Sequence, residues 1–194
     1  CCRSAPCAID GILEIREQME ARLGLKIQNM SEAEILAEQI QAIEIDTYLV
    51  GYKQCAVSDG CLHPKTVLDA KFSTPYSAAA AFLYGTVGME QFEPEVVFDP
   101  AVQNLLERVV VRPSDRFTGQ YPKHWGCHVK VTMQDGAVYE SEVEDPSGSV
   151  ARPLSRDQTM KKAEEFLSVV CPGREQKTIV ELLNLESREQ LPII

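Results

Sequence analysis

The feature that most constrains the fold is a pair of alternating apolar and polar runs on either side of Asp135-Gly136. The runs cover residues 128–133 and 137–143. Alternation with a period of two is typical of strands with one buried face, and Asp-Gly between two such runs favours a hairpin turn of type I′. The chain is therefore expected to contain an antiparallel strand pair.

Helical signals dominate the beginning of the chain. Apolar residues recur at helical spacing over residues 9–23, which predicts an amphipathic helix. Ser4 is its predicted N-cap and Gly24 its end. A shorter helix is predicted to begin at Ser31, because the spacing of Ser31 to Glu34 is that of a capping box.

Local signals along the rest of the chain predict the order of the remaining elements. These are a strand over residues 40–48, irregular chain over 52–69, a helix from Thr74 to Gly85 or Gly88, a helix from Asp99-Pro100 through Leu106 into a strand at 109–111, a helix from Ser155 to Val170 and a terminal helix over 178–185. This order predicts an α+β fold with a mostly antiparallel sheet of about four strands covered by helices.

Charge excludes some classes of partner. The formal net charge of the 194 residues is −10, which argues against nucleic acid and anionic membranes as main partners. No apolar run approaches the roughly 18 residues that a membrane span needs. The seven cysteines are odd in number and unevenly spaced, so they are interpreted as reduced thiols in a cytosolic-type compartment.

Common nucleotide, zinc-protease and hydrolase motifs do not occur in the sequence. Soft metal ligands cluster at two places, Cys55, Cys61 and His63, and His124, Cys127 and His128. Neither cluster has the paired C-x2-C spacing of a zinc or iron–sulfur site. We therefore predict no metal site.

Two cations lie at predicted helix starts. Arg3 precedes the first helix, and Lys71 precedes the alanine-rich helix that begins near Thr74. A helix N-terminus carries unpaired N–H groups and a partial positive charge, so a nearby cation makes it a better anion site. The alternative is that Lys71 and Arg3 are solvated or pair with Asp69 and Asp10.

Four sequence blocks, in order, resemble the MmgE/PrpD family. Residues 70–80 (AKFSTPYSAAA), preceded by His63-Pro64, are similar to the family's A-K-F-S-x-P-Y-x-x-A-x-A motif. Residues 1–10 resemble its C-C-R-x-x-H-x-x-I-D-A segment, and residues 131–136 and 152–155, with Gly148, resemble its later D-G hairpin and P-L-S helix start. The blocks span nearly the whole chain, which makes the resemblance specific.

The resemblance implies a two-domain architecture. Family members combine a large all-helical domain with a smaller α+β lid domain, and their active site lies in the cleft between the two. This chain resembles the C-terminal part: residues 1–30 as the end of the helical domain, 31–150 as the lid, and 151–194 as helices that return to the helical domain. Its start at Cys1-Cys2 is interpreted as a cut within a longer chain. The implied partners are the missing N-terminal helical domain and a second copy in a homodimer.

The family includes 2-methylcitrate dehydratase, cis-aconitate decarboxylase and iminodisuccinate epimerase. We therefore expect part of a cofactor-independent lyase or isomerase for a small di- or tricarboxylate, with dehydration of a 2-methylcitrate-like substrate as the leading reaction. The isolated chain should be inactive and should expose an apolar face. The expected compartment is the cytoplasm, or the mitochondrial matrix in a eukaryote, because no targeting segment is visible.

The resemblance also assigns candidate site residues. Lys71 is the candidate for binding a substrate carboxylate, Ser73 for an additional hydrogen bond, and Arg3 for a second carboxylate clamp. Tyr76 and His63 are candidate catalytic residues, and the catalytic base is unassigned.

Two alternatives remain from the sequence. The family motif commonly has Thr-His where this chain has Ala5-Pro6, so a non-catalytic homologue or a separate binding or assembly module is the alternative from another class. A cysteine-based redox or metal protein is a third interpretation.

Overall fold

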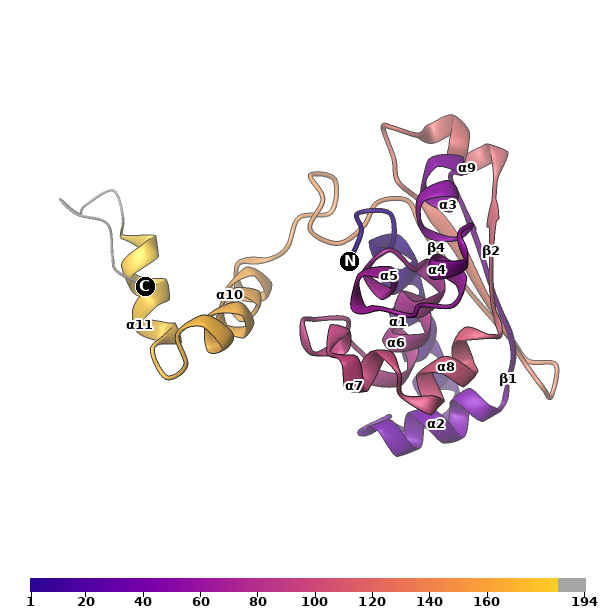
Figure 1. The fold of residues 1–194 in the computed structure, drawn as a ribbon, viewed down its shortest axis with the longest axis horizontal. Helices are drawn as coiled ribbons and strands as arrows, with labels where there is room; N and C mark the ends of the chain where they lie inside the picture. The colour runs from indigo at the N-terminus through magenta and orange to yellow at the C-terminus, as the bar shows by residue number, and fades with distance from the viewer. Residues whose placement is uncertain (185–194) are drawn as a thin grey trace. The chain divides into compact units, whose positions relative to one another are not determined.

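A computed structural model describes residues 1–184 of the chain (Figure 1). The chain divides into two compact units, Cys1–Ser147 and Gly148–Ile194. Within the described residues, no helix combines the length and the hydropathy needed to cross a membrane.

The first unit is built around a mixed sheet. Its strands among the described residues are β1 (Ile40–Thr47), β2 (Val109–Pro113), β3 (Cys127–Met133) and β4 (Val138–Val143). Their order is β2-β1-β3-β4, with β1 and β2 parallel and the other pairs antiparallel. The prediction of an α+β fold with a mostly antiparallel four-stranded sheet is confirmed.

The hairpin between β3 and β4 is confirmed, but the predicted type I′ turn is wrong. Type I′ requires a positive φ at both central residues, whereas only glycines have a positive φ in the described part of the chain. The N–H of Gly136 donates to the carbonyl of Met133 at 3.0 Å, and the N–H of Met133 donates to the carbonyl of Ala137 at 2.8 Å. With Gly136 at φ 85°, this is a three-residue loop in which a left-handed glycine follows a tight turn.

Helices make up most of the rest of the first unit. Those of the first unit are α1 (Pro6–Leu23), α2 (Met30–Glu38), α3 (Leu49–Cys55), α4 (Asp59–Leu62), α5 (Val67–Lys71), α6 (Thr74–Tyr84), the 3₁₀ helix η1 (Glu90–Phe92), α7 (Pro94–Val97), α8 (Pro100–Leu106) and α9 (Asp115–Gln120). The irregular chain predicted over residues 52–69 is therefore wrong: short helices, two of them with hydroxyl N-caps, Ser58 and Thr66, occupy much of it.

Predicted helix caps are displaced by one or two residues. The N-cap of α1 is Ala5 rather than Ser4, whose hydroxyl is bonded elsewhere. Asn29 caps α2 in place of the predicted Ser31, and Ser73 caps α6 in place of Thr74. In each of these two cases a neighbouring polar side chain accepts the backbone hydrogen bond that defines the cap.

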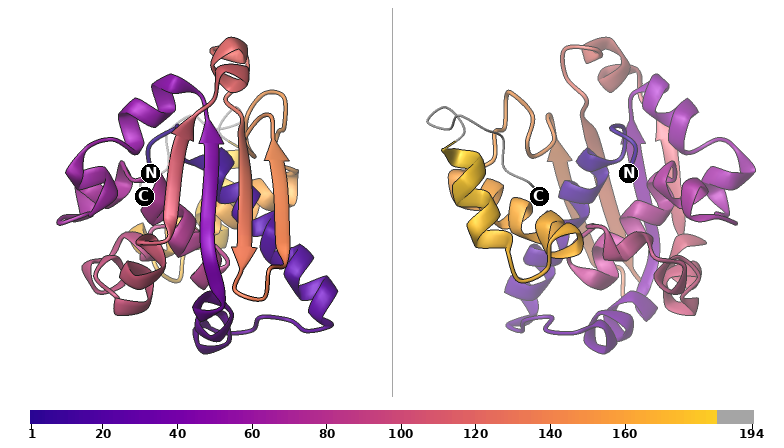
Figure 2. Two further views of the ribbon diagram at one scale, coloured as in Figure 1. Left: turned by 90° about the vertical axis from the view of Figure 1, so that its right-hand side faces the viewer. Right: turned by 60° about the vertical axis from the view of Figure 1, so that its left-hand side comes forward.

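One face of the sheet is covered by α1 and α6. Helix α1 packs against β3 and β4, and α6 packs against α1 and β2. The close approach of α1 needs Gly11, because a Cβ at this position would lie 2.7 Å from a methyl group of Val129. The opposite face carries ion pairs from Glu44 to Arg112 at 2.8 Å and to Lys130 at 3.3 Å. The left view of Figure 2 looks onto this open face.

The second unit is a helical pair. Helices α10 (Arg156–Val170) and α11 (Glu175–Leu183) pack against each other, and a Ser155–Gln158 capping box starts α10. The helix from Ser155 to Val170 is confirmed, whereas the terminal helix begins three residues before Thr178, and its predicted end at Leu185 lies outside the described residues. Exposed apolar side chains on the described part of this unit are Val150, Phe166, Val169, Val170, Val180, Leu182 and Leu183.

Gly126 provides a test of packing beside β4. A Cβ at Gly126 would lie 2.8 Å from the carbonyl oxygen of Val143 and 3.1 Å from that of Glu144, and backbone atoms cannot rotate away. We expect Gly126→Ala to lower the free energy of unfolding by about 1–3 kcal/mol in urea denaturation. Gly119→Ala is the control, because no atom lies within 4 Å of its Cβ position and alanine favours a helix. Equal stability of the two variants would contradict this packing.

Candidate functional site

The two helices that cover the sheet begin at the same end of the first unit. The N–H of Cys2 donates to the carbonyl of Lys71 at 2.7 Å, next to the starts of α1 and α6. Further along both helices, the guanidinium of Arg16 donates to the carbonyls of Phe82 and Leu83, near the end of α6. The helices therefore run parallel, and the positive ends of their dipoles lie together.

Arg3 and Lys71 are the cations at this end. Both side chains are exposed, and Lys71 is the last residue of α5. Within residues 1–184, no carboxylate lies within 4 Å of either cation, so the alternative pairing with Asp69 and Asp10 is absent. The guanidinium of Arg3 lies 5.6 Å from the centre of the Trp125 ring instead. Segments 68 positions apart in the sequence thus place two available cations beside two helix N-termini.

Ser73 and Tyr76 are fully buried at the start of α6. The Ser73 hydroxyl accepts the backbone N–H of Tyr76 at 2.9 Å and donates to the carbonyl of Cys61. The Tyr76 hydroxyl donates to the carbonyl of Gln91, and burial raises its pKa. Both hydroxyls therefore hold the helix start in place, and their predicted roles toward a substrate stay predictions.

His63 lies at the C-cap of α4, with 53% of its side chain exposed. Its Nδ1 atom is 3.3 Å from a carboxylate oxygen of Glu107, at the end of α8. This contact ties His63 to the end of α8. A role of His63 in catalysis stays a prediction.

A chain of hydrogen bonds that the sequence did not indicate lies beside Arg3. The Tyr48 hydroxyl donates to the Ser4 hydroxyl at 2.9 Å, and Ser4 donates to the Gln54 side-chain carbonyl at 3.0 Å. Burial raises the pKa of Tyr48, although the hydrogen bond with Ser4 acts in the opposite direction. The phenol therefore stays neutral and can act as a hydrogen-bond donor.

Two aromatic rings pack against Tyr48, the first residue of this series of hydrogen bonds. The Tyr48 ring stacks on Tyr121 with a centroid distance of 4.8 Å and meets Trp125 edge-on at 5.7 Å. Trp125 in turn carries the guanidinium of Arg3 on its face. Sequence reasoning placed Tyr48 at the end of a strand, and no local signal connects it to rings about 75 positions away.

The cysteines are free thiols in the structure. Burial raises the pKa of Cys55, and its contact with the thiol of Cys2 adds to the effect. The hydrogen-bond contact with Cys7 and burial likewise raise the pKa of Cys127. Raised thiol pKa values disfavour the reactive thiolate, so the structure favours packing roles for Cys55 and Cys127.

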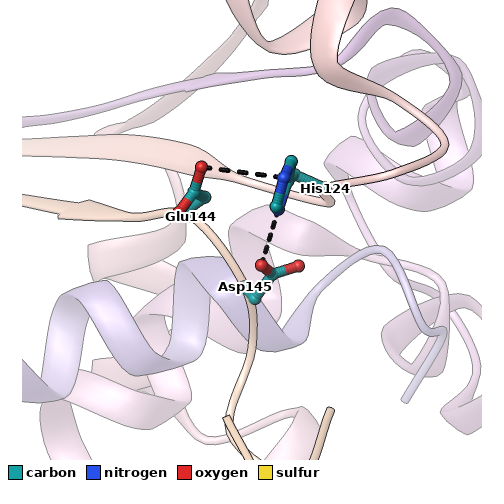
Figure 3. A group of neighbouring side chains, drawn as sticks. All are labelled: His124, Glu144 and Asp145. Carbon is teal, nitrogen blue, oxygen red and sulfur yellow. Dashed lines mark hydrogen bonds and ion pairs between the residues drawn. The ribbon is translucent and has the colours of Figure 1, made fainter. Parts of the chain in front are cut away.

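His124, Glu144 and Asp145 form a cluster next to Trp125 (Figure 3). Nδ1 of His124 lies 2.7 Å from a carboxylate oxygen of Asp145, and Nε2 lies 3.8 Å from one of Glu144. Among the described residues, these three side chains are the group of His, Cys, Asp and Glu that lies close enough together to hold a metal ion. Since Asp145 occupies Nδ1, two donors, Nε2 and Glu144, would remain for an ion, fewer than the three protein ligands of a typical catalytic zinc site.

Two surface hollows lie elsewhere on the first unit. One includes Leu83 and Arg108 in its lining, and the other includes Arg16 and Tyr84. Neither contains Arg3, Lys71 or another predicted site residue.

Comparison with known proteins identifies relatives of the chain. It is 29% identical over 126 residues to the cis-aconitate decarboxylase-like protein oryM of Aspergillus oryzae, covering 64% of this chain and 26% of that protein. It is 25% identical over 136 residues to the cis-aconitate decarboxylase of Mus musculus, covering 68% of this chain and 27% of that protein. The chain spans about a quarter of the length of these relatives. The family model of the MmgE/PrpD C-terminal domain matches residues 1–186, and the chain therefore belongs to the MmgE/PrpD family.

Proposed function

We propose that this chain is the carboxylate-binding part of a cofactor-independent lyase for a small di- or tricarboxylate. The observation that supports it is the position of Arg3 and Lys71 at the parallel N-termini of α1 and α6, where neither cation pairs with a carboxylate of residues 1–184. In a chain of net charge −10, this local arrangement favours a small anion although the whole surface repels polyanions.

Both candidate reactions need a proton transfer at a carbon near a carboxylate. In a decarboxylation of cis-aconitate, CO2 leaves, its bonding electrons stay on the carbon skeleton, and a proton is added there. In a dehydration of a 2-methylcitrate-like substrate, a base removes a proton from carbon and the hydroxyl group leaves as water. Fixed positive charge stabilises the developing anion in either case.

Decarboxylation is the first candidate, because one relative is named a cis-aconitate decarboxylase and another a cis-aconitate decarboxylase-like protein. Dehydration of a 2-methylcitrate-like substrate is the second, supported by the motifs around Lys71 that the family shares. The proposal includes binding of this chain to an N-terminal helical domain and a homodimer of the whole protein.

The whole protein should convert one of the two substrates without added metal or cofactor. Proton NMR distinguishes the products by the protons on their C=C bonds, and CO2 release identifies decarboxylation. Citrate should also raise the melting temperature of the protein, since binding to the folded state stabilises it. Light scattering tests the homodimer.

Absence of turnover of both substrates, together with no citrate effect on melting, would reject the proposal. That outcome would leave the non-catalytic binding or assembly module as the better explanation. A requirement for zinc or iron would instead support the third interpretation from the sequence.

A further inference from the structure

We propose that His124 and Asp145 form a proton-transfer pair of this same site, with Nε2 of His124 as the atom that accepts or delivers the proton. The inference deepens the proposed function and rests on it. It starts from the contact between His124, in the loop before β3, and Asp145, in the segment after β4 (Figure 3).

The environment distinguishes His124 from the other histidines of the chain. The exposed fraction of its side chain is 22%, and that of Asp145 is 12%. His63 and His128 lie at 53% and 30%, and their carboxylate partners, Glu107 and Glu140, are more than half exposed. Only the pair of His124 and Asp145 is thus held mainly away from water, where a hydrogen bond orients an imidazole most firmly.

The hydrogen bond determines which nitrogen can react. The Asp145 carboxylate accepts a hydrogen bond from Nδ1–H at 2.7 Å, which fixes the ring and leaves the lone pair of the neutral imidazole on Nε2. Glu144 lies 3.8 Å from Nε2, beyond hydrogen-bond distance, so Nε2 has no hydrogen-bond partner among residues 1–184.

The pair lies beside the cation-bearing end. Trp125, which follows His124 directly, carries Arg3 on its ring, and Arg3 precedes α1. Two residues after Asp145, the N–H of Ser147 donates to a carboxylate oxygen of Asp10 on α1 at 2.6 Å. The two loop segments that supply His124 and Asp145 are therefore both fixed near the start of α1.

The chemistry balances for either candidate reaction. In a dehydration, Nε2 takes the proton from carbon, the electrons of the C–H bond form the C=C bond, and the departing hydroxide takes a proton from solvent to become water. In a decarboxylation, the protonated Nε2 gives its proton to the carbon that receives the electrons left by CO2. His124 returns to its starting state by exchange of one proton with solvent.

The test compares His124→Ala, His124→Asn and Asp145→Asn in the whole protein. General acid–base catalysis contributes about 10²–10⁴-fold, so both His124 variants should lose at least about 100-fold in kcat with little change in KM. Asparagine keeps a donor for Asp145 and so preserves the local structure. Asp145→Asn should lower kcat by a smaller factor, because it removes only the orientation of the ring. Imidazole in the buffer should restore part of the activity of His124→Ala.

His128→Ala is the matched control, because His128 lies on the open face of the sheet and pairs with Glu140. It should keep wild-type kcat. A wild-type kcat for His124→Asn, or a loss in His124→Ala that imidazole does not restore, would overturn the assignment. Either result leaves the proposed function intact as long as the wild-type protein turns over its substrate, whereas a wild-type protein without turnover would reject both proposals.

Discussion

Replacement of Lys71 by methionine should lower kcat/KM of the whole protein for the proposed di- or tricarboxylate substrate by about 100-fold. A hydrogen bond to a charged group contributes about 1.5–3 kcal/mol, which corresponds to a factor of about 10–150. Lys71 is exposed and has no carboxylate partner among the described residues, so its ammonium group is available to a ligand without first breaking an ion pair. Methionine retains much of the length of the lysine stem and removes only the charge. Steady-state kinetics over a range of substrate concentrations measures the effect.

The matched control for this change is Lys65→Met. Lys65 is also exposed and lies six positions earlier, but its ammonium is 2.6 Å from a carboxylate oxygen of Asp59. Its loss should leave kcat/KM within about twofold, because an exposed ion pair contributes little. The stabilisation by citrate should likewise disappear in Lys71→Met and persist in Lys65→Met. Equal kinetics of the two variants would show that Lys71 does not bind the substrate.

The predictable part of the site consists of features that a short stretch of sequence encodes. Arg3 and Lys71 were found because a hydroxyl, a proline and an apolar run mark a helix start within about ten residues. The sheet was predictable for the same reason, since the runs beside Asp135-Gly136 alternate locally. The type of turn was not predictable, because Asp-Gly also fits a loop in which glycine alone has a positive φ.

The rest of the site depends on contacts between distant segments. Ser4 was a reasonable N-cap by its position, but in the fold its hydroxyl joins Tyr48 and Gln54, which are 44 and 50 positions away. His124 and Asp145 are 21 positions apart and meet because β3 and β4 pair in the register that the hairpin sets. A local pattern cannot reveal such pairs, because each side chain alone fits an ordinary loop.

The same limit applies to Arg16, which the periodicity of the first helix places among its polar residues. The structure buries this side chain to 9% exposure, and its guanidinium donates to the carbonyl of Phe82, 66 positions away. Further bonds of 3.2 Å reach the carbonyls of Leu83 and Ile27. The last carbonyls of a helix have no partner within the helix, so Arg16 supplies the donors that α6 lacks at its end.

Arg16→Met should therefore lower the free energy of unfolding by about 3 kcal/mol. A buried carbonyl that loses its donor costs about 1–3 kcal/mol, and methionine fills part of the volume but donates no hydrogen bond. Urea denaturation followed by circular dichroism measures the change. Arg22→Met on the same helix is the control. The Arg22 side chain is exposed and its guanidinium lies 5.4 Å from the centre of the Tyr139 ring, so its loss should cost less than about 1 kcal/mol. If the two variants unfold at the same urea concentration, Arg16 does not close the end of α6, and the parallel alignment of α1 and α6 that brings Arg3 to Lys71 would depend on apolar packing alone.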